Sequence, residues 1–160
     1  MRILFVCLGN ICRSPTAEGV MRSRLAARGL ADLVEVDSAG TGSWHTGSPP
    51  DQRSAEAALR REIALEGEAR TVAPEDFERF DLLLAMDSEN LENLRALAPT
   101  GEAASRVGML REYDPAAVAA GELDVPDPYY GGAGGFEHVL DVVEAACDGL
   151  LDHLEPRLTG

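Results

Sequence analysis

The stretch RILFVCLGNICRSP, residues 2–15, decides the fold of this chain. Its apolar run ILFV at 3–6 is typical of a strand that is buried on both faces of a parallel sheet. Ser14 and Pro15 are favoured residues for the N-cap and the first position of a helix. The stretch therefore predicts a buried strand that ends near Cys7, followed by a short loop and a helix.

The remaining sequence repeats this alternation of strand and helix. Further strands are predicted at 33–37 (LVEVD), 81–86 (DLLLAM) and 105–110 (SRVGML). Helical patterns are predicted at 15–28, 51–62, 88–97 and 136–154. We expect a single α/β domain over residues 1–160, with a four-stranded parallel sheet, helices on both of its faces and a phosphate-binding loop after the first strand.

The composition narrows the class of protein and its partners. The chain has 160 residues and a formal net charge of −14, from 28 acidic and 14 basic residues. Such a charge repels nucleic acid and acidic membranes, so we expect neither as a partner. The N-terminal apolar run is too short for a membrane span and lacks the order of a secretory signal. We expect a cytoplasmic monomer, and the 3 cysteines argue against a disulfide framework.

The loop after the first strand combines features that suit an anion. Cys7 ends the strand, Gly9 allows a sharp turn, and the following helix points its N-terminus inward. Converging N–H groups and the positive end of the helix dipole attract a phosphate and favour the ionised form of the Cys7 thiol. The backbone groups expected to surround the phosphate are those of Leu8, Gly9, Asn10, Ile11 and Cys12.

Arg13 supplies what the backbone of this loop lacks. Its planar guanidinium suits two phosphoryl oxygens and balances their charge. With an ionised Cys7, it favours phosphoryl transfer without a metal or a cofactor, and that reaction needs an acid to protonate the leaving group. Asp114 and Asp127 both precede a proline and both suit a turn, so residue types alone do not choose between them.

Four stretches resemble the low-molecular-weight protein tyrosine phosphatases. They are VCLGNICRSPTAE at 6–18, SAGTGSWHTGSPPD at 38–51, DLLLAMDSEN at 81–90 and DPYYGG at 127–132. They occur in the order of that family and span nearly the full chain. The resemblance implies hydrolysis of phosphotyrosine in proteins, and of small aryl phosphates, through a phosphocysteine intermediate.

The resemblance also implies a role for each matching residue. Cys7 is expected to be the nucleophile, Arg13 the phosphate clamp, and Asp127 the general acid and then the base. Asn10 and Ser14 are expected to hold the loop and the thiolate through hydrogen bonds, and Ser38 is expected to support them from behind. The aromatic walls of a phosphotyrosine slot are expected to be Trp44, Tyr129 and Tyr130.

Four further residues complete the expectations. Asp87 is expected to cap a helix near the site, where a supporting role is open. For Cys12 the resemblance implies a reversible disulfide with Cys7, and a merely packed thiol is the alternative. Cys147 falls on the apolar face of the last helix and is expected in the core. Glu68 stands where the family commonly has a histidine, so support of the site through that position is open.

Three other functions are compatible with the same loop. A protein arginine phosphatase shares the scaffold, but its members tend to carry threonine at the position of Ile11 and a shorter segment at 127–132. Arsenate reductases use additional cysteines near the middle of the chain, and this chain has none between residues 13 and 146. A non-catalytic phosphate carrier has no need of a leaving-group acid, so Asp127 separates it from an enzyme.

Overall fold

The computed structural model describes residues 1–128 and 134–160. Among these residues the strands form a parallel sheet in the order β2-β1-β3-β4. They are β1 (Arg2–Cys7), β2 (Glu35–Gly40), β3 (Leu82–Ala85) and β4 (Val107–Met109). The predicted fold class is therefore confirmed, although the second strand begins later than predicted and continues to Gly40.

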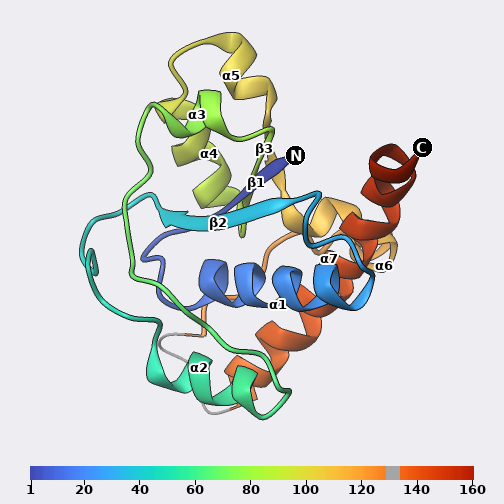
Figure 1. Cartoon of the computed structure of the whole chain (residues 1–160). Coiled ribbons are helices and arrows are strands. Elements are labelled where there is room, and N and C mark those ends of the chain that lie inside the picture. The colour runs from blue at the N-terminus through green and yellow to red at the C-terminus, as the bar shows by residue number, and fades with distance from the viewer. Residues whose placement is uncertain (129–133) are drawn as a thin grey trace.

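Helices cover both faces of this sheet (Figure 1). One face carries α1 (Arg13–Ala27), α2 (Gln52–Leu59) and α7 (Gly134–Thr159). The opposite face carries α3 (Asp76–Arg79), α4 (Ser88–Leu97) and α5 (Gly101–Ser105). After β4 the chain forms a 3-10 helix, η1 (Leu110–Tyr113), and α6 (Pro115–Ala120). The sheet is thus the middle layer of three.

The alternation of side chains along β1 explains why the sheet is covered twice. Ile3, Phe5 and Cys7 pack into the apolar cluster that includes α1 and α7. Leu4 and Val6 point the other way, into the cluster with the residues of α3 and α4. Because side chains alternate across a strand, an unbroken apolar run needs a core on each side. The predicted burial of this strand on both faces is confirmed.

The start of α1 differs from the prediction. The helix begins at Arg13, so Pro15 is its third residue, and Cys12 takes the N-cap position without a side-chain cap bond. The predicted cap residue, Ser14, instead places its hydroxyl oxygen 2.9 Å from the sulfur of Cys7. The prediction was wrong because a serine hydroxyl can bond either to the backbone N–H groups of a helix or to another side chain. The loop places the hydroxyl of Ser14 beside the buried sulfur of Cys7, so it does not cap the helix.

The parallel arrangement gathers three loops at one edge of the sheet. β1, β2 and β3 all end at this edge, so the segments 8–12, 41–51 and 86–87 emerge beside one another. Open α/β sheets bind their ligands at the carboxyl ends of the strands. Within the described ranges, none of the helices has the length and apolar character needed to span a bilayer.

Candidate active site

The loop 8–12 wraps around the sulfur of Cys7. Asn10 has a left-handed backbone, with φ of 56°, which turns the chain back toward the strand end. As a result, the N–H of Asn10 donates to the sulfur at 3.3 Å. The Ser14 hydroxyl lies 2.9 Å from the same atom. The sulfur is thus buried, with a backbone donor and a hydroxyl group beside it.

The end of β2 holds the loop from outside. The carbonyl oxygens of Cys7, Leu8 and Ile11 accept hydrogen bonds from the segment that follows β2. Their donors are the N–H groups of Thr41 (2.9 Å), Gly42 (3.0 Å) and Asp51 (2.8 Å). A Cβ at Gly40 would lie only 2.7 Å from the carbonyl oxygen of Leu8, so this close approach requires glycine. The loop is therefore rigidly attached to the sheet.

Arg13, the first residue of α1, lies buried directly after the loop. Its guanidinium binds Asp87 at 2.6 Å and the carbonyl oxygen of Val125 at 3.1 Å, and Asp127 lies 3.6 Å away. Burial opposes the charge of Arg13, but the negative groups of Cys7, Asp87 and Asp127 outweigh it and raise its pKa above the ordinary value. The guanidinium is thus permanently charged and fixed in direction, as a clamp for an anion requires.

Asp87 links this clamp to the helix that follows β3. One of its carboxylate oxygens accepts from the N–H of Asn90 at 2.7 Å and caps α4, as the sequence predicted. The other oxygen binds Arg13. Asp87 therefore orients the guanidinium from a second structural element.

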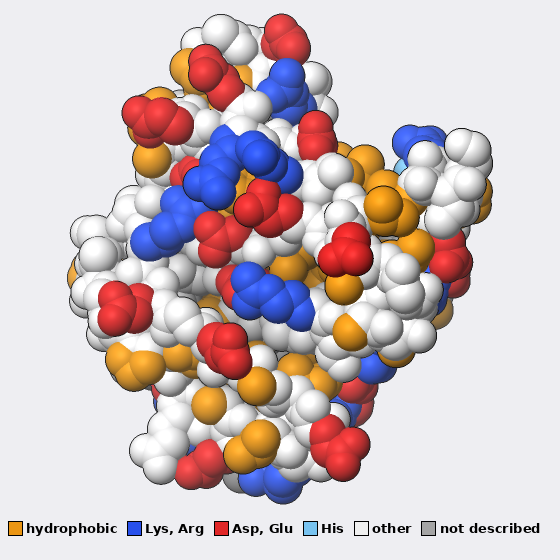
Figure 2. Space-filling view, in the orientation of Figure 1, with side chains coloured by type: hydrophobic (Ala, Val, Ile, Leu, Met, Phe, Trp, Pro, Cys, Tyr) orange, Lys and Arg blue, Asp and Glu red, His pale blue; other side chains and the backbone are white. Residues whose placement is uncertain are grey.

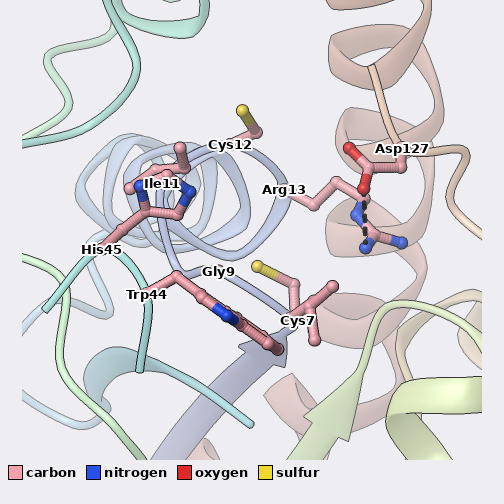
Figure 3. A pocket seen from close by; sticks show the side chains of 9 residues that line it. Cys7, Gly9, Ile11, Cys12, Arg13, Trp44, His45 and Asp127 are labelled. Carbon is pink, nitrogen blue, oxygen red and sulfur yellow. Dashed lines mark ion pairs between the residues drawn. The ribbon is translucent and has the colours of Figure 1, made fainter. Parts of the chain in front are cut away.

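A cavity of about 400 Å³ opens above the loop (Figure 3). In the close-up Trp44 and His45 reach it from the segment after β2, while Asp127 stands beside Arg13 on the other side. The side chain of Asp127 is 42% exposed, so its carboxyl group faces both the cavity and water. The lining residues are Cys7, Leu8, Gly9, Ile11, Cys12, Arg13, Trp44, His45 and Asp127.

His45 is a lining residue that the sequence did not reveal. A Cβ at Gly9 would lie 3.0 Å from its ring, so the imidazole rests directly on the loop. The one feature of the sequence that points to His45 is its position next to Trp44, a predicted wall residue. Trp44 itself is 74% exposed. Tyr129 and Tyr130, the other predicted wall residues, lie outside the described part of the chain.

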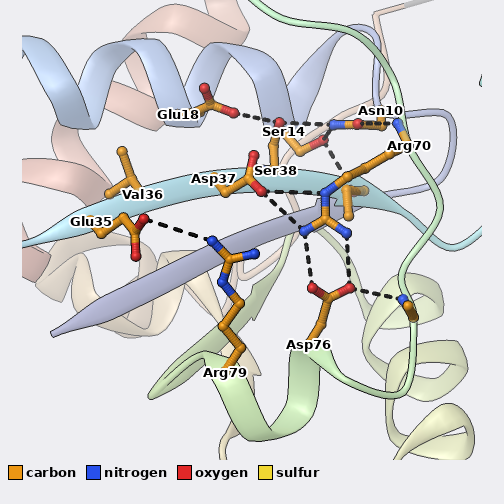
Figure 4. A network of polar contacts seen from close by, with 12 residues as sticks. Asn10, Ser14, Glu18, Glu35, Val36, Asp37, Ser38, Arg70, Asp76 and Arg79 are labelled. Atoms are coloured by element: carbon orange, nitrogen blue, oxygen red, sulfur yellow. Dashed lines mark hydrogen bonds and ion pairs between the residues drawn. The ribbon is translucent and has the colours of Figure 1, made fainter. Parts of the chain in front are cut away.

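A hydrogen-bonded network supports the loop from behind the cavity (Figure 4). The side-chain amide of Asn10 donates to Ser14 at 2.9 Å and to Ser38 at 3.0 Å. The Ser38 hydroxyl donates to Glu18 at 2.7 Å, and the N–H of Arg70 donates to the amide oxygen of Asn10 at 3.0 Å. Glu18 and Arg70 were missed because tertiary contacts alone bring them to the site.

Glu68 is not among the residues that line the cavity above the loop. Its side chain is exposed and lines a second cavity of about 280 Å³, whose wall also includes Glu18 and Ser38. This is the position at which the resemblance leads us to expect a histidine. Behind Ser38 the network ends at the carboxylate of Glu18.

Cys12 differs from Cys7 in its surroundings. Burial raises the pKa of its thiol to about 12, and a hydrogen bond with Ser54 offsets this only in part. Cys147 is fully buried in the core of α7, as predicted, and all three cysteines are free thiols. At neutral pH Cys12 is thus a neutral thiol in the wall of the cavity.

The donor set gives no indication of a metal centre. In the part of the chain that the structure describes, no three His, Cys, Asp or Glu side chains are grouped as metal ligands. The charge that faces an anion in this cavity comes from Arg13. A buried cysteine and an arginine at the two ends of an anion-binding loop, with an aspartate beside them, define a cysteine-based phosphatase.

Comparison with known proteins specifies the family. Residues 2–158 match the family described as low molecular weight phosphotyrosine protein phosphatase. A low molecular weight protein-tyrosine-phosphatase of Streptomyces coelicolor is 51% identical, over 99% of this chain and 96% of its own length. The chain therefore belongs to the low molecular weight phosphotyrosine protein phosphatase family.

Solved structures agree with this assignment. The protein tyrosine phosphatase of Entamoeba histolytica, crystallised with Hepes in its active site, superimposes with a TM-score of 0.92 at 38% identity and covers 98% of both chains. A Drosophila arginine phosphatase superimposes with a TM-score of 0.89 at 32% identity, over 97% of this chain and 98% of its own. The fold alone thus does not separate the two substrate classes.

Proposed function

We propose that this phosphatase hydrolyses phosphotyrosine in proteins, and small aryl phosphates, through a phosphocysteine on Cys7. The single observation that carries the proposal is that Cys7, Arg13 and Asp127 line one cavity. In it a sulfur that accepts hydrogen bonds lies in the same wall as a buried guanidinium, and a partly exposed carboxyl group is available for proton transfer.

The first half of the reaction transfers the phosphoryl group to the enzyme. The sulfur of Cys7 attacks phosphorus, and the bond between phosphorus and the phenolic oxygen breaks. Asp127 gives its proton to that oxygen, so tyrosine leaves as a neutral phenol. Arg13 and the N–H groups of the loop hold the phosphoryl oxygens as the S–P bond forms.

The second half releases phosphate. Asp127, now a carboxylate, takes a proton from a water molecule that attacks phosphorus on the side opposite to the sulfur. The S–P bond breaks, inorganic phosphate leaves, and the thiolate of Cys7 is restored. The donors from Asn10 and Ser14 stabilise the sulfur as a leaving group in this step, just as they stabilise it before the attack.

The cavity wall favours an aryl substrate over phosphoarginine. Ile11 and Trp44 both line it, and their apolar surfaces suit a phenyl ring better than a charged guanidino group. The threonine expected of an arginine phosphatase is absent from position 11.

Arsenate reduction is disfavoured by the positions of the thiols. It needs further reactive cysteines to relay oxidation, and Cys147 is fully buried within the core. This leaves Cys12 as the partner thiol that lines the cavity with Cys7. The reversible Cys7–Cys12 disulfide stays a prediction.

The proposed mechanism also bears on location and oligomeric state. A nucleophilic thiol must stay reduced, which supports a cytoplasmic location. Cys7, Arg13 and Asp127 line one cavity of a single chain, which supports a monomer as the active form.

The test of this proposal is turnover of para-nitrophenyl phosphate and of a phosphotyrosine peptide, with a thiol reductant and without added metal. The wild type should hydrolyse both, and Cys7→Ser should lose about 10⁴-fold or more. Cys147→Ala is the control. It removes a thiol of α7 that is buried in the hydrophobic core, and it should keep most of the activity. A strong preference for a phosphoarginine peptide would overturn the tyrosine assignment.

A further inference from the structure

The hydrogen bonds behind the loop form a chain whose direction matters. Asn10 stands at its centre, with its amide nitrogen toward Ser14 and Ser38 and its amide oxygen toward the N–H of Arg70. With this orientation the oxygen of Ser14 accepts from Asn10, and its own hydrogen is available for the sulfur 2.9 Å away. The carbonyl oxygen of Ala39, at 3.5 Å, is a more distant alternative acceptor.

The opposite orientation of the Asn10 amide would reverse the direction of these hydrogen bonds. With its oxygen toward the two serines, Asn10 would accept their hydroxyl hydrogens, and Ser14 would no longer donate to Cys7. The side chain of Asn10 is buried, so water is not a ready substitute partner. The groups that fix the orientation of this amide therefore affect the charge on the sulfur.

We propose that Glu18 is a positioning residue that, together with the backbone N–H of Arg70, fixes the direction of this chain of hydrogen bonds and thereby keeps Ser14 donating to Cys7. An ionised carboxylate only accepts hydrogen bonds, so Ser38 must give its hydrogen to Glu18. The oxygen of Ser38 is then free to accept from the amide nitrogen of Asn10. This inference rests on the proposed function, because it explains how the nucleophile is kept ionised.

The surroundings of Glu18 hold its carboxylate in place. Arg22, one turn further along α1, pairs with its second oxygen and also donates to the carbonyl oxygen of Val36 at 3.0 Å. The charged groups that face Glu18 are Arg22 on its own helix, Asp37 on β2, and Glu66 and Glu68 on the segment after α2. Only Arg22 in this set is positive, so the ionised state of Glu18 depends on Arg22 and Ser38.

An ionised Glu18 does not favour stability. Glu18 is 7% exposed, and burial raises its pKa above the ordinary value, although Ser38 and Arg22 partly offset this. A raised pKa means that the protonated form of Glu18 favours the folded state. Its contribution to the free energy of unfolding is present below the ordinary pKa of glutamate and is lost as pH rises through the pKa of the folded state. A neutral substitute should therefore fold at least as well at neutral pH.

Glu18→Gln is the informative variant. Arg22 requires an oxygen, so the glutamine should turn its NH₂ group toward Ser38, whose hydrogen is then free to bind a reversed Asn10 amide. Reversal also breaks the hydrogen bond from the N–H of Arg70, so only part of the molecules should adopt it and the effect should be modest. The readout is the rate at which iodoacetamide modifies Cys7, followed by mass spectrometry of its peptide at about pH 6 and about pH 8. Only the thiolate reacts, so the ratio of the two rates reports the ionised fraction. This measurement needs no phosphatase turnover.

We expect Glu18→Gln to lower the ratio of the modification rate at about pH 6 to the rate at about pH 8 by about threefold. The melting temperature should not fall. Ser14→Ala should lower the ratio at least as much. The matched control is Glu102→Gln on α5, which also pairs with an arginine four residues later but has a side chain that is 80% exposed. It should leave the ratio unchanged.

Two results would overturn the proposal. One is a ratio in Glu18→Gln equal to that of the wild type while Ser14→Ala lowers it. The other is a proportional change of both rates together with a lower melting temperature, which would show a purely structural role. If the ratio falls as expected but aryl phosphates are not hydrolysed, the inference about Glu18 stands and the proposed function fails.

Discussion

Asp127 is the residue on which the distinction between an enzyme and a phosphate carrier depends. Its carboxyl group lies 3.6 Å from Arg13 and is partly exposed, which suits exchange of a proton with substrate and water. Asp127→Asn keeps the shape of the side chain but removes the proton. We expect the hydrolysis of phenyl phosphate to slow by about 10²-fold or more, because phenol is a poor leaving group without an acid.

The control for this prediction is Asp124→Asn on the same segment. Asp124 is exposed and accepts hydrogen bonds from Ser88 at 2.8 and 2.9 Å, outside the catalytic cavity. Steady-state rates of the two variants are to be compared with phenyl phosphate and with a substrate of better leaving group. An unchanged rate for Asp127→Asn would favour a carrier.

At the residue scale, the sequence predicts some contacts and not others. Cys7 and Arg13 follow from their spacing around a turn, because the chemistry of an anion loop is local. Asp127 required the resemblance, since Asp114 also precedes proline, and the structure shows Asp114 capping α6 through the N–H of Ala116 at 3.1 Å. Glu18 could not be predicted, because its burial arises from packing between α1 and β2.

At the scale of elements, length separates what the sequence predicts from what it does not. The strands carry unbroken or alternating apolar residues, and the longer helices carry apolar residues at helical spacing or clear end signals, so their positions were predicted. The short helices α3, α5 and α6 span only 4 to 6 residues, which is too few for a period to appear. Local caps such as Thr100 of α5 hold them, together with contacts to the rest of the fold.

Gly149 shows how an element can depend on tertiary contact against its own propensity. It lies inside α7, where alanine would ordinarily favour the helix by about 1 kcal/mol. A Cβ at this position would overlap the carbonyl oxygen of Tyr113 at the end of η1. We expect Gly149→Ala to lower the free energy of unfolding by about 1–3 kcal/mol, because backbone must move.

Gly134→Ala is the matched control for this prediction. It lies at the start of the same helix, and a Cβ there would have no atom within 4 Å. Urea unfolding of the two variants measures the difference. Equal or increased stability of Gly149→Ala would show that α7 and η1 do not pack as closely as described.

At the scale of the whole molecule, acidic and basic side chains are interspersed, but acidic ones are in excess. Figure 2 shows basic side chains lying beside acidic ones on one face of the molecule. Many such ion pairs join different elements, and Arg61 binds both Glu137 and Glu144 of α7 at 2.8 Å. Because acidic residues outnumber basic ones, the net charge of −14 remains as a long-range negative field.

This field should influence the choice among phosphopeptides. At low salt it repels an acid-rich peptide and attracts an arginine-rich one, and physiological salt shortens the screening length from about 30 Å to about 8 Å. We expect kcat/KM to rise with salt for a phosphotyrosine peptide with acidic flanks and to fall for one with basic flanks. The measurement is kcat/KM for each peptide over a series of salt concentrations. An identical salt dependence for the two peptides would contradict this expectation.

The most direct test of the central claim is to trap the phosphoenzyme. A rapid acid quench during turnover of para-nitrophenyl phosphate, followed by mass spectrometry, shows which side chain carries the phosphoryl group. We predict a phosphoryl group on the sulfur of Cys7 in the wild type and none on Cys7→Ala. A phosphoryl group on another residue, or undiminished turnover by Cys7→Ala, would contradict the account.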